Sequence, residues 1–239
     1  SSLLEAIYNN IRQLIIGRVY SSGDLAYYNR GRQFPDFIIS NVNSSIDSVL
    51  LPTLASVQDK REQVKQMTRR AIKLSTYIIA PLMLGLASVA EPMIRVVLTE
   101  KWIPALPYLR IFCITFMFYP LHTANLNAIK ALGRSDLFLR LEVLKKIIGI
   151  VVLLLTMKLG VLAMAYSLLF TTLTSQIINS WPNRKLLNYG YMEQVKDIMP
   201  NIALACVMGV IVYPLKYLES NSLIILLIQI VAGGIVYVV

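Results

Sequence analysis

The protein has 239 residues, of which 56% are hydrophobic and 15% are charged, and its formal net charge is +10 at pH 7. Soluble domains are about 45–50% apolar and about 25% charged, so this chain has too little polar surface to enclose a water-facing globule of its size. The same composition excludes intrinsic disorder, a collagen-like fibre and a small disulfide-rich domain. A strongly basic chain suggests a nucleic-acid partner, but a membrane protein explains the charge better, because cytoplasmic loops collect Lys and Arg. We therefore predict a membrane protein that binds no nucleic acid.

Eight stretches are long and apolar enough to cross a bilayer, which takes roughly 17–25 residues of helix. They are predicted at Leu3–Tyr20, Pro35–Val57, Ile72–Leu98, Pro104–Leu132, Leu137–Met157, Gly160–Trp181, Ile198–Leu218 and Leu223–Val239. The first two are unusually polar, whereas the fifth, seventh and eighth are plainly apolar and are expected to face lipid or to close the bundle. The chain begins at Ser1 without a methionine or a signal peptide, and it stops at Val239 inside an apolar run without a polar flank. We therefore expect a piece of a longer protein whose last span is incomplete.

The basic residues alternate between the two sides that these spans define. Fourteen lie on one set of alternate connections: Lys60, Arg61, Lys65, Arg69, Arg70, Lys73, Lys130, Arg134, Arg140, Lys145, Lys146, Arg184, Lys185 and Lys196. Six lie on the other side, at Arg18, Arg30, Arg32, Lys101, Lys158 and Lys216, and three lie within spans, at Arg12, Arg95 and Arg110. The positive-inside rule predicts this pattern for spans that start from the cytoplasm.

The first span carries a polar stripe along one helical face. Glu5, Asn9, Arg12 and Gln13 follow the spacing of such a face. An arginine in hydrocarbon costs about 2.5–3.5 kcal/mol on insertion scales, so Arg12 is expected to face a partner or a water-filled cavity. A pair between Glu5 and Arg12, two turns apart, would also neutralise the charge, and both interpretations stay open.

The second span repeats this pattern with smaller side chains. Ser40, Asn43 and Asp47 share one stripe, and Asn41, Ser44, Ser45 and Ser48 lie beside it. Small hydroxyl and amide residues also let membrane helices pack closely, so packing is the alternative explanation. Two consecutive polar spans together favour a hydrated central cavity.

Motifs for covalent chemistry are missing from the sequence. It contains no phosphate-binding loop, nucleophile elbow or zinc-protease motif, and the two cysteines, Cys113 and Cys206, are far apart. The lone His122 is expected to bind a neighbouring side chain. We therefore expect no enzyme activity, no cofactor and no metal site. The arginines favour a polar, anionic cargo, because the guanidinium group binds phosphate oxygens in pairs.

Several short segments together resemble a known family. In order they are LIIGR at 14–18, LAYYNRG at 25–31, LP at 51–52, TEKW at 99–102 and ALGRS at 131–135. This order resembles the Wzx-type oligosaccharide flippases of the multidrug/oligosaccharidyl-lipid/polysaccharide (MOP) exporter superfamily. The resemblance implies an all-α polytopic membrane bundle with about eight transmembrane helices. It also implies that the chain is the second lobe of a two-lobe transporter plus two extra C-terminal helices. Residues 1–182 would form the six-helix lobe, and residues 183–239 would form a cytoplasmic loop and the extra pair.

The resemblance also implies a function and its partners. Such proteins flip undecaprenyl-pyrophosphate-linked oligosaccharide across the bacterial cytoplasmic membrane by alternating access, for export of lipopolysaccharide or exopolysaccharide. Partners would be this lipid-linked substrate, membrane lipids, a missing N-terminal lobe and the polysaccharide polymerase machinery. Cavity candidates are Glu5, Asn9, Arg12, Asn43 and Asp47. Arg18, Arg30 and Arg32 would lie near the outer mouth and receive the pyrophosphate, or anchor lipid head groups.

Two other functions remain open at this stage. A cation-coupled multidrug exporter of the same superfamily would use an acidic cavity, and Asp47 could couple ion flow or form an internal salt bridge. A non-transporting membrane scaffold of polysaccharide assembly would need no aqueous path.

Overall fold

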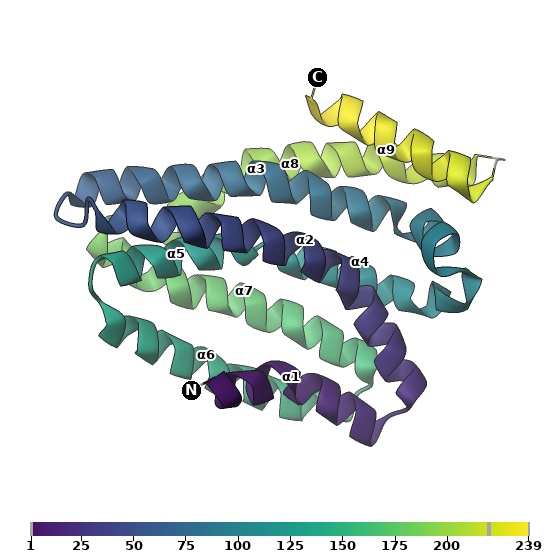
Figure 1. The fold of residues 1–239 in the computed structure, drawn as a ribbon, viewed down its shortest axis with the longest axis horizontal. Coiled ribbons are helices and arrows are strands. Elements are labelled where there is room, and N and C mark those ends of the chain that lie inside the picture. Colours follow the sequence, from purple (N-terminus) through teal and green to yellow (C-terminus); the bar gives the residue numbers. More distant parts are fainter. Residues whose placement is uncertain (1, 219–220, 239) are drawn as a thin grey trace.

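A computed structural model describes the backbone of residues 2–218 and 221–238 and the side chains of residues 10–218 and 221–237. The chain folds into an elongated bundle of helices that run back and forth along its longest axis (Figure 1). The helices are α1 (Ser2–Val19), α2 (Ser22–Ala55), α3 (Arg61–Met93), α4 (Leu106–Phe116), α5 (Tyr119–Ala131), α6 (Ser135–Thr156), α7 (Val161–Leu186), α8 (Tyr191–Val212) and α9 (Ser222–Val238). Short π- and 3₁₀-helical segments join them at Ile94–Leu98 (η1), Glu100–Ala105 (η2) and Tyr213–Tyr217 (η3).

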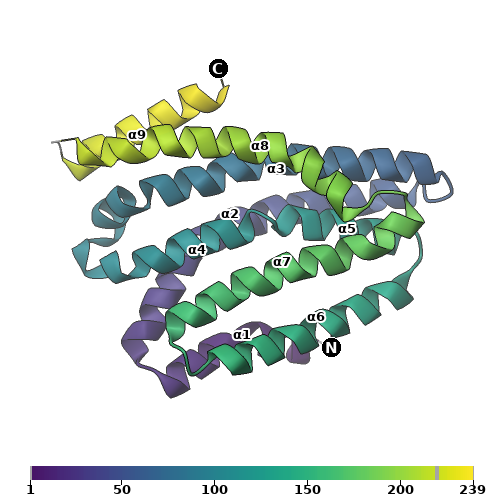
Figure 2. The ribbon, with the colours of Figure 1, turned by 180° about the vertical axis from the view of Figure 1, so that it is seen from behind.

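The connections between helices gather at the two ends of the bundle (Figures 1 and 2). The links α2–α3, α5–α6 and α7–α8 share one end, and these are the connections predicted to be basic. The links α1–α2, η1–η2, α6–α7 and α8–α9 share the other end. Each predicted span therefore corresponds to one passage through the bundle, with α4 and α5 forming a single broken passage.

Much of the described surface is apolar. Large side chains point outward from the four C-terminal helices, for example Leu155, Phe170, Val210 and Val231, each at least 58% exposed. Exposed apolar area on this scale is abnormal for a protein in water. Four described helical stretches are long and apolar enough to cross a membrane: Arg61–Leu98, Glu100–Ala131, Val161–Leu186 and Tyr191–Tyr217. The prediction of a helical membrane bundle is confirmed.

The turn from α1 into α2 is set by a reciprocal cap. Ser21 precedes the helix, and its Oγ accepts a hydrogen bond from the Asp24 backbone at 3.0 Å. The Asp24 carboxylate in turn accepts from the Ser21 backbone N–H at 3.2 Å. This arrangement satisfies two backbone donors at the start of the helix and places a negative charge at the positive end of its dipole. It fixes where α2 begins.

Helices α2 and α4 approach closely at Gly31. A Cβ atom at this position would lie 2.6 Å from Tyr108 Cβ and 2.8 Å from the Leu109 backbone nitrogen. Close to this contact, the rings of Tyr28 and Phe112 meet edge to face with their centroids 5.1 Å apart. Glycine is therefore required at residue 31 by contact with backbone atoms that cannot move aside.

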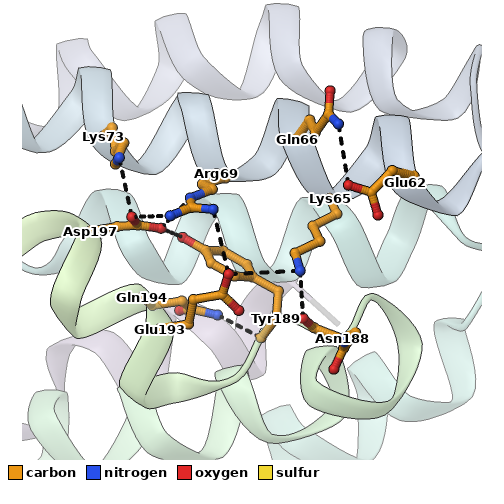
Figure 3. A network of polar contacts seen from close by, with 10 residues as sticks. All are labelled: Glu62, Lys65, Gln66, Arg69, Lys73, Asn188, Tyr189, Glu193, Gln194 and Asp197. Carbon is orange, nitrogen blue, oxygen red and sulfur yellow. Dashed lines mark hydrogen bonds and ion pairs between the residues drawn. The ribbon is translucent and has the colours of Figure 1, made fainter.

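A network of ion pairs fastens α8 to α3 at the basic end (Figure 3). The side chain of Asp197 is only 5% exposed, and Arg69 binds it through Nε at 2.6 Å and Nη2 at 2.7 Å. Lys73 Nζ lies 3.2 Å from the same carboxylate, and the Tyr189 hydroxyl donates to it at 3.0 Å. Glu193 completes the network at longer distances, 3.5 Å from Arg69 and 3.7 Å from Lys65. Asp197 is the centre of this network.

Replacing Gly31 with alanine should destabilise the protein. The added methyl group would overlap the α4 backbone, and overpacking of this kind costs about 1–3 kcal/mol. The measurement is the thermal unfolding temperature of the purified variant. Gly23→Ala is the matched control on α2, because its nearest new contact is Ser21 Oγ at 3.5 Å. An unchanged unfolding temperature for Gly31→Ala would contradict the close approach.

Asp197→Asn should weaken the attachment of α8 to α3. The amide cannot pair with two cations, and charged hydrogen bonds contribute about 1.5–3 kcal/mol, so we expect a loss of about 2 kcal/mol. Chemical denaturation in detergent measures it. Glu193→Gln should cost less than about 1 kcal/mol, because its ion pairs are long and partly exposed. Equal losses from the two variants would show that Asp197 has no central role.

Candidate functional site: a cationic cavity among five helices

A break in one helical passage shapes the centre of the bundle. Proline lacks an N–H group and interrupts helical hydrogen bonding, and Pro120 stands in the first turn of α5. The chain leaves helical geometry just before it, between Phe116 and Tyr119. Gln176 of α7 donates its Nε2 hydrogen to the Phe118 carbonyl at 2.5 Å. The same carbonyl also accepts a hydrogen bond from the Leu121 backbone N–H at 3.2 Å, so the side chain of Gln176 adds a link between α7 and the break.

A polar cavity of about 300 Å³ lies beside this break. Its walls come from α1, α2, α5, α6 and α7. The lining residues are Ile11, Arg12, Tyr28, Arg32, Asn43, Tyr119, His122, Thr123, Glu142, Lys145, Lys146, Gly149, Ile150, Leu153, Leu168, Thr171, Thr172 and Ser175. Four of these side chains are cationic and one is a carboxylate. The cavity therefore has the charge to receive an anion.

Arg12 joins α1 to α7 across the cavity wall. Its Nη1 atom donates to the Met164 carbonyl and, at 2.6 Å, to Ser167 Oγ. Both acceptors belong to α7, so these bonds hold the guanidinium group of Arg12 in place beside the cavity. The expectation that Arg12 faces a partner or a cavity agrees with this position.

Three buried polar atoms on α2 line the same cavity without a hydrogen-bond partner among the described residues. They are Tyr28 Oη, Arg32 Nε and Asn43 Oδ1. Arg32 also lies 3.6 Å from Asp36 and over the Phe116 ring at 5.8 Å. Buried polar atoms in proteins are nearly always hydrogen-bonded, so this part of the wall is suited to a polar ligand.

Helix α6 contributes charged residues that sequence reasoning assigned elsewhere. Lys145 and Lys146 were predicted to lie in a connection, and the fifth span was expected to face lipid or close the bundle. The assignment of the lysines to a connection was wrong, because α6 begins at Ser135 and places both lysines and Glu142 in the cavity wall. Other faces of α6 carry exposed large apolar side chains. The spacing from Glu142 to Lys145, Lys146 and Gly149 is i, i+3, i+4 and i+7. This helical periodicity could have identified the face from sequence.

His122 is held by a neighbour in the way the sequence predicted. Its Nδ1 atom lies 2.9 Å from Asn179 Nδ2 of α7, and its ring meets Tyr119 edge to face. No group of three His, Cys, Asp or Glu side chains within residues 10–218 and 221–237 is arranged to hold a metal ion.

The other predicted site residues lie elsewhere. Asp47 is exposed and accepts a hydrogen bond from Asn127 at 2.7 Å. Arg18 is exposed, and Arg30 binds Gln33 at 2.7 Å and stacks over Trp102 at 5.0 Å. None of these three lines the cavity. The Glu5 and Asn9 side chains lie outside the described residues, and so does the predicted Glu5–Arg12 pair.

A second cavity, of about 320 Å³, lies between α3, α8 and α9. Its lining is apolar apart from Gln229, whose Nε2 donates to the Val212 carbonyl at 3.0 Å, and Tyr237, whose hydroxyl donates to the Tyr77 carbonyl at 2.7 Å. It contains no charged residue, so the case for an anion depends on the first cavity alone.

The fold and the first cavity define a class: a helical membrane protein with a cationic cavity lined by several of its helices. Comparisons with known proteins show which proteins this chain is similar to. Residues 1–107 match the family described as "Polysaccharide biosynthesis protein". Over 99% of its length the chain is 22% identical to the teichuronic acid biosynthesis protein TuaB of Bacillus subtilis, of which it covers 50%. Over 75% of its length it is 24% identical to the lipopolysaccharide biosynthesis protein WzxC of Escherichia coli, of which it covers 36%.

The fold has a solved counterpart. The lipid II flippase MurJ, in an inward closed conformation, superposes with a TM-score of 0.78 at 16% identity, over 97% of this chain and 50% of that one. These matches confirm the predicted resemblance to Wzx-type polysaccharide biosynthesis proteins, as well as the predicted fold class. The chain spans about half the length of TuaB and MurJ, and less of WzxC.

Arg12→Met should loosen α1 from α7 while keeping the apolar stem of the side chain. Two hydrogen bonds from a charged donor are lost, so the free energy of unfolding should fall by about 1.5–3 kcal/mol. Thermal unfolding in detergent measures the change. Arg18→Met, on the same helix but exposed, should change stability by no more than about 0.5 kcal/mol. Similar losses in both variants would contradict the bridging role of Arg12.

Proposed function

We propose that the complete protein is a transporter, not an enzyme, and that it moves a phosphate-bearing lipid-linked saccharide across the bacterial cytoplasmic membrane. The observation that carries this proposal is the cavity lined by Arg12, Arg32, Lys145 and Lys146 inside an apolar bundle. A cationic side chain inside the bilayer is unfavourable in free energy, and such residues usually mark the path of a substrate or ion. Arginine and lysine are both suited to binding phosphate groups.

The specific cargo that we propose is undecaprenyl-pyrophosphate-linked oligosaccharide, flipped by alternating access. The names of two relatives associate them with teichuronic acid and lipopolysaccharide, and the structural neighbour is named a lipid II flippase. A pyrophosphate head group needs a hydrated cationic path, while its lipid tail can stay among the acyl chains. The cationic cavity provides groups for the first requirement, and the apolar outer surface is compatible with the second.

The exposed side of α2 carries polar side chains, which supports a translocation path that borders on this helix. Ser40, Asn41, Ser44 and Ser48 are exposed on this helix, and their side chains donate to carbonyls of the same helix. Hydroxyl and amide oxygens facing hydrocarbon would be unfavourable. We therefore infer that this side faces the translocation path or a further lobe of the complete protein. Membrane lipids and the polysaccharide polymerase machinery are the other partners that we propose.

The test is translocation by the complete protein in liposomes. Arg32→Gln should lower the rate of glycolipid flipping at least about tenfold, because one charged hydrogen bond contributes about 1.5–3 kcal/mol. Fluorescent glycolipid that becomes accessible to a membrane-impermeant quencher reports the rate.

Arg140→Gln is the control for that measurement. Arg140 is exposed on α6 and does not line the cavity, so its loss should leave the rate within about twofold. Equal effects of the two variants, or flipping that is independent of the complete protein, would refute the proposed function.

A further inference from the structure

The cationic cavity contains its own anion. Glu142 is the one carboxylate among the described residues that line it. It comes from α6, one helical turn before Lys145. The following inference about Glu142 rests on the proposed function, because it concerns how the same cavity receives an anionic cargo.

Glu142 and Lys145 form a close pair within the wall. Glu142 Oε1 lies 2.5 Å from Lys145 Nζ, and their side chains are 27% and 13% exposed. Two of the other cations, Arg12 and Arg32, make contacts with groups outside the lining or with uncharged acceptors. Arg12 donates to a carbonyl and a hydroxyl of α7, and Arg32 is 3.6 Å from Asp36, which lies outside the lining. Lys145 is thus a cavity cation whose ion-pair partner also belongs to the cavity.

This pairing has a direct physical reason. An ammonium group in a low-dielectric interior needs a counter-charge, and three further cations line the same cavity. Glu142 supplies that charge from its own helix. A carboxylate and a phosphate group are acceptors for the same ammonium hydrogens, so an incoming phosphate competes directly with Glu142 for Lys145.

We propose that Glu142 is a place-holding anion that occupies Lys145 until the phosphate group of the cargo replaces it. Glutamate can make this exchange because its side chain has three rotatable bonds and can turn away while the helix stays in place. The exchange also selects the ligand. A single phosphate replaces one anion with another, whereas a pyrophosphate also offers oxygens to the remaining cations. The cavity should therefore prefer pyrophosphate to orthophosphate.

Binding of inorganic pyrophosphate to the complete protein tests this exchange. The protein is placed in nanodiscs of neutral phosphatidylcholine, and calorimetry measures affinity. Glu142→Gln should tighten binding about tenfold, within the range usual for coupling between two sites, and Lys145→Gln should weaken it by a similar factor. Glu142→Asp keeps the charge but shortens the side chain, so it should tighten binding by a smaller factor and serves if the glutamine variant does not fold.

The chain offers a closely matched control pair. Glu91 and Lys216 lie 3.2 Å apart, with side chains 29% and 13% exposed, and neither lines the cavity. Glu91→Gln removes the same charge from the protein and should leave pyrophosphate affinity within about twofold. Equal tightening by Glu91→Gln would show that net charge alone is responsible and would overturn the proposal.

Further arms identify the source of the anion. Orthophosphate should bind the wild-type protein more weakly than pyrophosphate, and equal affinities would contradict the exchange. Adding phosphatidylglycerol to the nanodiscs tests whether lipid head groups enter the cavity. If they do, the apparent affinity for pyrophosphate falls, and the phosphate group that replaces Glu142 at Lys145 is that of a lipid. Unchanged affinity assigns the site to the pyrophosphate group itself.

The outcome separates this inference from the proposed function. Normal glycolipid flipping with no gain in affinity for Glu142→Gln or Glu142→Asp would overturn the place-holder alone. Tighter pyrophosphate binding in a protein that flips no glycolipid would overturn the proposed function while leaving the exchange in place.

Discussion

The interior of a bilayer contains no water to bind polar groups, and this constraint underlies the main features of the structure. Each polar group within the bundle must find its partner in the protein. Gln176 donates to the carbonyl of Phe118 at the break before Pro120, and Arg12 donates to acceptors on α7. Some buried polar atoms have no hydrogen-bond partner among the described residues. Those of Tyr28, Arg32 and Asn43 belong to residues that line the cavity, whereas others, such as Thr76 Oγ1, lie elsewhere in the bundle.

The cavity lies where elements of different packing meet. Gly31 brings α2 against α4 with backbone contact, and the Asp197 network fastens α8 to α3. Helix α1, by contrast, crosses the cavity wall and is tied to α7 through the side chain of Arg12. Helix α1 also packs into the core through Ile16, which is fully buried. The cavity wall at α1 is therefore held both by apolar packing and by polar contacts with α7.

Much of the fold could be predicted from the sequence, since the apolar stretches correspond to the passages through the bundle and the basic connections share one end. The position of Arg12 also followed from the cost of a cation in hydrocarbon. The charged face of α6 was missed, although its sequence signal was present. Lys145 and Lys146 were counted with a basic connection because they stand near the start of the span, but the i, i+3, i+4 spacing from Glu142 places all three on one face of the helix. Asp47 illustrates the opposite limit. Its stripe was identified, but its contact with Asn127 depends on how α2 packs against α5.

The pairing of Glu142 with Lys145 on a single helix has an electrical consequence. The transmembrane potential does work of about 2.3 kcal/mol on each elementary charge moved through 100 mV. Because the carboxylate and the ammonium group are carried by neighbouring turns of α6, a rigid displacement of that helix moves no net charge from this pair. The membrane voltage therefore exerts almost no net force on α6 through these two residues while they are paired. It acts on them only once they have separated.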